Sequence, residues 1–224
     1  MNLTAPAVVR ELHADERGFA ATRDPRYARQ RQALLRAVGR SPRLAAAIVR
    51  LAPGERDDVL ARRDLERLAA GSPPLRVRIR VAPAPPAARL LGWYREAERR
   101  FGVRWQLLAA VNFVESAFGR VRNASTAGAQ GPMQFLPATW RTYGLGGAVH
   151  DPHAAILGAA NDLRANGAAT DERRALYAYN HSSLYVDAVL HYAHRIAHVQ
   201  DAFAEYYAWA VYVRTPSGER RYTP

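Results

Sequence analysis

The stretch Trp105-Gln-Leu-Leu-Ala-Ala-Val-Asn-Phe-Val-Glu-Ser-Ala-Phe118 contains the pattern on which the fold prediction depends. Its apolar residues recur at intervals of three and four, the spacing of one face of an α-helix. With a turn of about 100° per residue, Glu115 falls on that face, within the arc set by Leu108, Val111 and Phe118. We therefore expect an amphipathic helix that carries one carboxylate on its buried side.

A carboxylate in that position is expected to hold its proton more strongly than usual. Moving a charge out of water costs several kcal/mol, and the negative end of the helix dipole, just before Gly119, acts in the same direction. A carboxylic acid that is still protonated near neutral pH can protonate a glycosidic oxygen. The alternative is a Glu115 side chain that turns to solvent or pairs with Arg104 or Arg122.

The other acidic residues in this half of the chain have more ordinary positions. Asp151 is expected to cap a helix, and Asp162 is expected on the side of its helix opposite the apolar stripe. Glu98 is an ambiguous rival to Glu115, and Asp187 lies at the edge of an apolar face. A second catalytic carboxylate, of the kind that retaining and inverting glycosidases use, is therefore not evident.

Helical patterns with clear start and stop signals surround the 105–118 stretch. Asp, Ser or Pro opens most of them, and Gly or Asn follows several of their last turns. The expected segments are 24–39, 41–54, 55–71, 87–101, 151–167, a helix that starts at Thr170 or Asp171, and a long one from Ser182 or Ser183 through Ile196.

Two segments have strand patterns. Leu75-Arg-Val-Arg-Ile-Arg-Val81 alternates apolar and basic residues, and residues 208–214 are aromatic and β-branched before a turn at Thr215-Pro-Ser-Gly218. We expect strands near 75–81 and 208–222 to form a small antiparallel β element. The predicted protein is mainly α, with an Arg-rich helical region at 1–71 and a helical domain at 72–224.

Composition sets limits on the partners. The net charge is +12 with no lysine, and residues 1–100 contain 21 Arg against 11 acidic residues, while the remainder contains 11 against 9. A basic first half can attract anionic wall polymers, nucleic acid or anionic lipid, although no nucleic-acid recognition motif is present and no nucleic-acid partner is expected. Cysteine is absent, so disulfides and thiolate sites are excluded. No stretch has the length of a membrane span, and we expect a soluble monomer.

Three local motifs follow one another in the second half: Glu115-Ser116, Ser125-Thr-Ala-Gly-Ala-Gln-Gly-Pro-Met-Gln-Phe135 and Tyr177-Ala-Tyr-Asn180. As an ordered set, over roughly residues 87–197, they resemble the soluble lytic transglycosylase family, which is related to goose-type lysozyme. Pro132 stands where the family more commonly has leucine, which removes a backbone donor there. The resemblance implies a lysozyme-like helical domain with a groove for a polysaccharide.

The resemblance also implies roles for individual residues. Glu115 would be the general acid and then the general base, Tyr179 would orient it, and Asn180 would bind an acetamido group of the substrate. The residue types alone also allow structural roles, namely core packing for Met133 and Phe135, a helix-end hydroxyl for Ser116 and a buried aromatic ring for Tyr179. The implied substrate-binding residues are Ser116, Met133, Gln134, Phe135, Tyr177, Tyr179 and Asn180.

The implied reaction is non-hydrolytic cleavage of peptidoglycan at the bond between N-acetylmuramic acid and N-acetylglucosamine, with a 1,6-anhydro product. A hydrolytic lysozyme on the same fold and a noncatalytic wall-binding module are the alternatives. No cofactor or metal is expected, since His191, His194 and His198 fit a polar helix face. Action on the wall implies an extracytoplasmic protein whose export segment is outside this sequence or is not recognisable in it.

Overall fold

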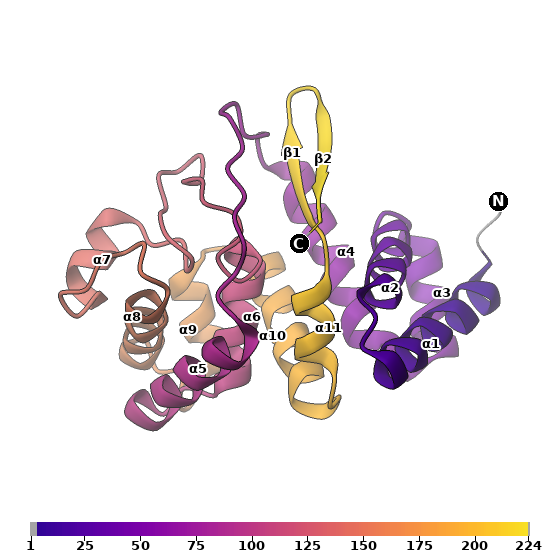
Figure 1. Cartoon of the computed structure of the whole chain (residues 1–224), viewed down its shortest axis with the longest axis horizontal. Helices are drawn as coiled ribbons and strands as arrows, with labels where there is room; N and C mark the ends of the chain where they lie inside the picture. The colour runs from indigo at the N-terminus through magenta and orange to yellow at the C-terminus, as the bar shows by residue number, and fades with distance from the viewer. Residues whose placement is uncertain (1–3, 224) are drawn as a thin grey trace.

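The computed structural model of the chain describes residues 4–223, and these form a mainly helical protein with one small antiparallel sheet (Figure 1). The elements are α1 (Ala5–Thr22), α2 (Pro25–Gly39), α3 (Pro42–Leu51), a 3-10 turn (Pro53–Glu55), α4 (Arg56–Gly71), α5 (Ala87–Phe101), α6 (Trp105–Ser116), α7 (Pro137–Tyr143), α8 (Pro152–Ala165), α9 (Glu172–Tyr179), α10 (Ser183–His198), α11 (Ala202–Ala208), β1 (Val211–Thr215) and β2 (Gly218–Tyr222).

Helices α6 and α10 occupy the middle of the molecule. Helix α10 packs against both α6 and α4. Through α4, the first 71 residues are therefore in direct contact with the second half of the chain. In Figure 1, α1–α4 lie to one side of this centre and α5 and α7–α9 to the other. A single buried apolar cluster runs from Val8 to Trp209. The fold is thus confirmed as mainly α with a small antiparallel hairpin.

Most predicted helix starts are found where the capping residues indicated. Asp24 accepts a hydrogen bond from the backbone N–H of Arg26 at 2.9 Å, and Asp151 accepts one from Ala154 at 2.7 Å. These side chains satisfy backbone donors that the first turn leaves free. Helix α6 ends two residues earlier than expected, because Ala117 and Phe118 adopt φ angles of 52° and 64°. This left-handed turn redirects the chain straight after Glu115 and Ser116.

The prediction of a strand at 75–81 is wrong. Strands β1 and β2 pair only with each other, while residues 72–80 have no regular structure and Val81 makes one isolated bridge to Val121. One backbone hydrogen bond, from Leu75 N–H to the Arg214 carbonyl at 3.1 Å, joins this segment to the hairpin. The alternating pattern required one covered face, yet Val77 is 58% exposed. Without a sheet or helix to bury that face, alternation does not stabilise a strand.

Buried ion pairs fasten the first helices to the end of the chain. Arg31 of α2 has no exposed surface and binds Glu55, Asp58 and Glu205 at 2.7, 2.6 and 2.9 Å. Gln32 exchanges two hydrogen bonds with the backbone of Ala210, just before β1. Helix α2 therefore helps to position the hairpin.

The three histidines proposed as a polar face lie on α10. The ring nitrogens of His191 and His194 contact the two oxygens of Asp57 at 2.8 and 2.5 Å, and His198 contacts the carbonyl of His194. Within residues 4–223, no group of three or more His, Cys, Asp or Glu side chains has the geometry of a metal site. None of the helices in this part of the chain is long and apolar enough to cross a membrane.

Candidate active site

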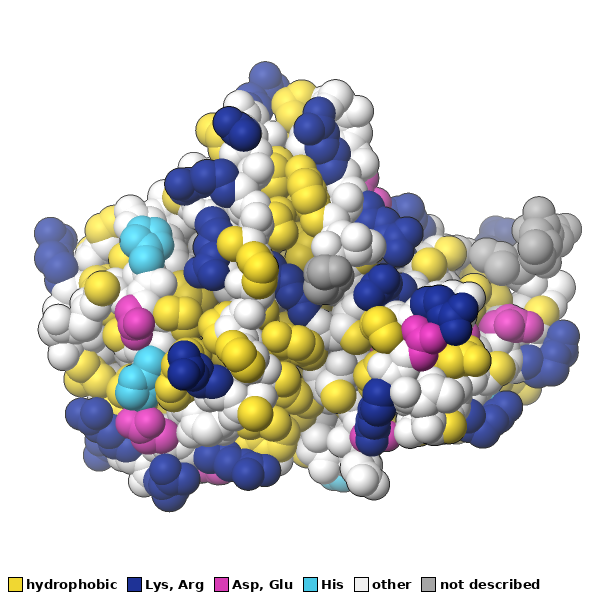
Figure 2. Space-filling model, viewed as in Figure 1, with side chains coloured by type: hydrophobic (Ala, Val, Ile, Leu, Met, Phe, Trp, Pro, Cys, Tyr) yellow, Lys and Arg dark blue, Asp and Glu magenta, His cyan; other side chains and the backbone are white. Residues whose placement is uncertain are grey.

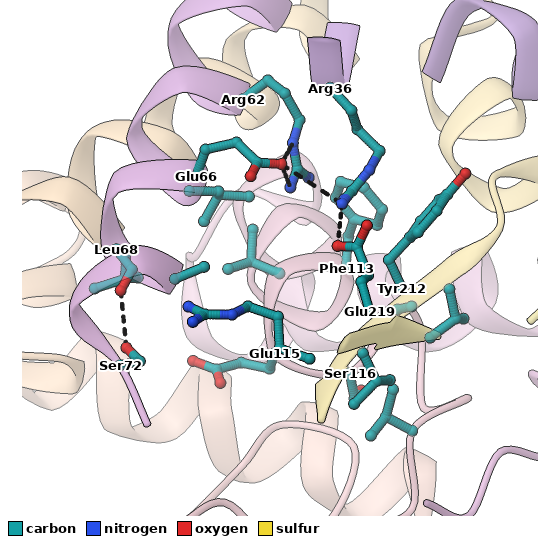
Figure 3. Close-up of a pocket in the computed structure, with 18 of the residues that line it drawn as sticks. Arg36, Arg62, Glu66, Leu68, Ser72, Phe113, Glu115, Ser116, Tyr212 and Glu219 are labelled. Carbon is teal, nitrogen blue, oxygen red and sulfur yellow. Dashed lines mark hydrogen bonds and ion pairs between the residues drawn. The ribbon is translucent and has the colours of Figure 1, made fainter. Parts of the chain in front are cut away.

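Glu115 lies in the last turn of α6 and lines a pocket of about 440 Å³ (Figure 3). The pocket is bounded by α4, the C-terminal end of α6 and the hairpin, with Tyr185 of α10 and Asn180 at the end of α9. The Glu115 side chain is partly covered and belongs neither to bulk solvent nor to the closed core. Arg104, considered as a partner for it, instead binds Glu172 at 2.6 Å.

The environment of Glu115 favours its protonated form. Burial raises the pKa of Glu115 to about 7, while the neighbouring Tyr185 hydroxyl acts in the opposite direction with a smaller effect. That hydroxyl is close enough to influence the carboxyl group but makes no hydrogen bond of standard geometry within the described residues. Near neutral pH, Glu115 is therefore poised to release a proton to a bound group and to take one back.

Ser116 holds the turn that follows α6. Its side chain is buried, with 1% of its surface exposed, and its hydroxyl donates to the Pro132 carbonyl at 2.5 Å and accepts from the Gly119 N–H at 2.8 Å. Because Pro132 begins the Pro-Met-Gln-Phe part of the second motif, these bonds tie that motif to the end of α6. Ser116 lines the pocket, and its hydroxyl is used to hold the turn and the second motif together.

The second motif is joined to Ser116 and Tyr179 through its backbone carbonyl groups. The Tyr179 hydroxyl donates to the Met133 carbonyl at 2.5 Å, while the Met133 side chain is fully buried in the core. Gln134 has a φ of 50° and donates from its amide nitrogen to the Gly131 carbonyl at 2.9 Å. Burial and the nearby carboxyl groups of Glu115 and Asp162 raise the pKa of Tyr179. Tyr179 thus connects the second motif, the third motif and the glutamate.

The remaining residues implied by the resemblance are distributed over three environments. Phe135 is buried and packs edge-on against the ring of Tyr179, with the ring centroids 5.7 Å apart. Tyr177 is 49% exposed and contacts His181. Asn180 lines the pocket beside Glu115. Of the eight site residues named from the sequence, Glu115, Ser116 and Asn180 line this pocket, whereas Met133, Gln134, Phe135, Tyr177 and Tyr179 do not.

The opposite wall of the pocket was not predicted. It contains a group of charged side chains from α2, α4 and β2, namely Arg36, Arg62, Glu66 and Glu219 (Figure 3). Arg62 binds Glu66 at 2.7 Å, Arg36 pairs with Glu219, and the Arg36 guanidinium lies 3.9 Å from the ring centroid of Tyr212. These residues are distant from Glu115 in sequence and belong to no local motif, so only their positions in the fold identify them.

The other carboxylates have separate surroundings. Glu98 accepts a hydrogen bond from the Trp105 N–H at 3.2 Å and so caps the start of α6, and Asp187 pairs with Arg173 at 2.6 Å. The expectation for Asp162 is wrong: it is buried, its pKa is raised to about 6 by that burial, and it accepts a hydrogen bond from Asn166 at 2.7 Å. A side-chain amide partner makes this burial tolerable at a position that the periodicity assigned to the polar face.

Comparison with known families gives one match, between residues 93–196 and the family described as transglycosylase SLT domain. The matched segment runs from α5 into α10 and contains Glu115 and the three motifs. Members of this family are lytic transglycosylases that act on peptidoglycan. No curated protein and no solved structure matches the chain.

Proposed function

We propose, from the transglycosylase SLT domain that residues 93–196 form, that the chain cleaves peptidoglycan glycan strands non-hydrolytically with Glu115 as its single acid and base. The observation that supports this most directly is a partly buried glutamate at a pocket wall whose pKa is raised to about 7. A group with that pKa is protonated often enough to act as an acid and is a strong enough base to recover the proton.

The proposed reaction has two proton transfers through the same side chain. Glu115 donates its proton to the oxygen that links C1 of N-acetylmuramic acid to N-acetylglucosamine, and the C1–O bond breaks. The C6 hydroxyl of the same muramic acid then attacks C1 and returns its proton to Glu115. The products are a 1,6-anhydromuramic acid end and a free N-acetylglucosamine end, and no water is consumed.

The surroundings of Glu115 favour this reaction over hydrolysis by two carboxylates. The rivals suggested by the sequence, Glu98 and Asp187, are engaged at a helix cap and in an exposed ion pair. The two other carboxylates that line the pocket, Glu66 and Glu219, are bound by arginines on the opposite wall. A retaining or inverting glycosidase would need a second carboxyl group about 5–10 Å from the first, facing the same bond. The internal nucleophile of muramic acid removes that requirement.

The neighbouring motif residues have supporting roles in this proposal. Asn180, in the same pocket as Glu115, binds the acetamido group of the sugar. Tyr179 holds the Met133 backbone and stands close to the glutamate, so it orients the acid. Ser116 fixes the turn after α6. A substrate in the wall also implies that the protein works outside the cytoplasm.

Analysis of the soluble products tests the proposal. Purified peptidoglycan is digested with the wild type, with Glu115→Gln and with Glu96→Gln, and the released muropeptides are identified by mass. Glu96 is a matched control because it is a partly exposed glutamate paired with His153 at the surface. We expect anhydro ends from the wild type and the control, and a loss of about 10³-fold or more for Glu115→Gln, since the reaction loses its acid and its base together. Reducing ends alone, or an active Glu115→Gln, would overturn the proposal.

A further inference from the structure

The pocket beside Glu115 continues into a second hollow along the hairpin. The two hollows share Glu66, Ala69, Arg214 and Glu219, and the second, of about 550 Å³, is also bordered by Arg40. Figure 2 shows basic side chains around the projecting part of the molecule that contains the hairpin. A ligand that extended from Glu115 past these shared residues would therefore follow a path toward a basic surface.

Positive charge is in excess along this path. The charged side chains of the two hollows are Arg36, Arg40, Arg62 and Arg214 against Glu66, Glu115 and Glu219. When Glu115 is protonated, two carboxylates face four guanidinium groups. We call these four residues the arginine wall.

The existing ion pairs leave the arginine wall only partly neutralised. Glu66 lies 2.7 Å from Arg62, 3.2 Å from Arg40 and 3.7 Å from Arg36. Glu219 also pairs with Arg36 and Arg40, so two carboxylates serve these three cations, and Arg214 adds a fourth to the lining. Burial lowers the pKa of Arg36, and the nearby positive charge of Arg62 acts in the same direction. An additional carboxylate from a ligand would offset this positive charge and could bind a guanidinium group through two hydrogen bonds.

Arg36 and Arg62 of the arginine wall lie in a different part of the pocket from the acid. In Figure 3 the Arg36, Arg62, Glu66 and Glu219 group lies apart from the carboxyl group of Glu115. The pKa of Glu115 stays raised although arginines line the same pocket. An anionic part of a ligand bound at Arg36 and Arg62 would therefore lie apart from the Glu115 carboxyl group.

We propose that the arginine wall is a carboxylate-binding subsite that recognises the acidic peptide stems of peptidoglycan while the glycan bond lies at Glu115. This inference rests on the proposed function, because it assigns the substrate to the same pocket. The carboxylate could also come from the lactyl group of a muramic acid without a stem, and the choice of substrates separates the two sources.

Three glycan substrates distinguish these sources in the wild type. The first has intact stems, the second has been stripped by an amidase and retains only lactyl carboxylates, and the third has intact stems whose carboxyl groups are converted to amides. We expect kcat/KM for release of anhydro ends to be about tenfold higher on the first than on the other two, the size of one charge-assisted hydrogen bond. Equal values on all three would overturn the subsite. Equal values on the first two, above the third, would overturn the assignment to stems.

Variants at the arginine wall give the second test. Arg62→Gln should raise KM about tenfold on intact stems and leave KM on the amidated substrate unchanged. Arg67→Gln is the control, because Arg67 lies on the same helix with 61% of its side chain exposed and does not line the pocket. Glu66→Gln should act in the opposite direction and lower KM on intact stems, since it removes the competing carboxylate.

A purely structural role gives a different pattern. Loss of folding or of pocket shape would change kcat and KM on all three substrates alike, and that result for Arg62→Gln would count against the inference. If Arg62→Gln does not fold, the wild-type comparison and Arg40→Gln, at a position with 54% of its side chain exposed, still decide the question. Absence of anhydro products from the wild type on every substrate would defeat the proposed function itself.

Discussion

Replacing Glu115 with glutamine should change how the stability of the protein depends on pH. The pKa of Glu115 is raised from 4.5 to about 7 in the folded state. The folded protein therefore binds a proton that the unfolded chain releases between these values, and this contribution to stability falls as the pH rises through that window. Glutamine has nearly the same shape as glutamic acid but does not titrate, so the stability of the variant does not fall in this way as the pH rises.

The size of the effect follows from the shift. A difference of about 2.5 pKa units, at about 1.36 kcal/mol per unit, corresponds to about 3 kcal/mol. Because the Glu115 side chain is partly exposed at the pocket, solvent screening reduces this upper value, and we expect about 2 kcal/mol. Relative to the wild type, Glu115→Gln should gain that much free energy of unfolding between pH 4.5 and pH 8.

Urea unfolding followed by circular dichroism at several pH values measures this difference. Other titrating groups contribute equally to both proteins and cancel in the comparison. Glu96→Gln, which removes a partly exposed carboxylate, is the control, because a surface substitution of this kind changes the free energy of unfolding by about 0.5 kcal/mol or less. A difference between Glu115→Gln and the wild type that stays flat from pH 4.5 to pH 8 would refute the claim that burial raises the pKa of Glu115.

Three further outcomes are expected. The value of kcat/KM should fall above about pH 7 as Glu115 loses its proton, which a pH–rate profile on soluble glycan would measure, and a rate that keeps rising to pH 9 would contradict it. Arg31→Met should lower the free energy of unfolding in urea by about 3–5 kcal/mol, because three buried carboxylates lose their shared cation; a loss below about 1 kcal/mol would contradict it. Ser116→Ala should cost about 1–3 kcal/mol, since the Gly119 N–H and the Pro132 carbonyl lose their buried partner, and a thermal midpoint equal to that of the wild type would exclude this role.

Local signals in the sequence predicted the helices well. Asp24, Asp151 and Ser182 each cap the helix that was expected to start there, because a capping hydrogen bond involves residues only two or three positions apart. The strand at 75–81 failed for the opposite reason. Alternation shows only that one face could be buried, and whether another element covers that face depends on the tertiary arrangement.

The residues of the candidate site divide in the same way, into those with a local sequence signal and those placed only by the tertiary arrangement. Glu115 could be found from sequence because Leu108 and Val111, on the same face of α6, lie seven and four residues before it. Tyr185 could have been noticed as a polar aromatic residue on an otherwise apolar face of α10, where its hydroxyl needs a partner. Arg62 and Glu219 had no such signal, since α4 and β2 are brought to the pocket by packing and ion pairs of long sequence separation.

The residues of the pocket lie on both sides of the boundary of the matched family domain. Glu115, Asn180 and Tyr185 fall inside residues 93–196, whereas Arg62 lies before this segment and Glu219 after it. The domain alone therefore contains the acid but only part of the surface that a substrate would meet. The first flanking segment is held against the domain because α4 packs along α10, and Arg36 of α2 pairs with Glu219, which joins the two flanking segments to each other. In this arrangement the acid lies within the matched family segment, while the charged opposite wall is built by residues outside it.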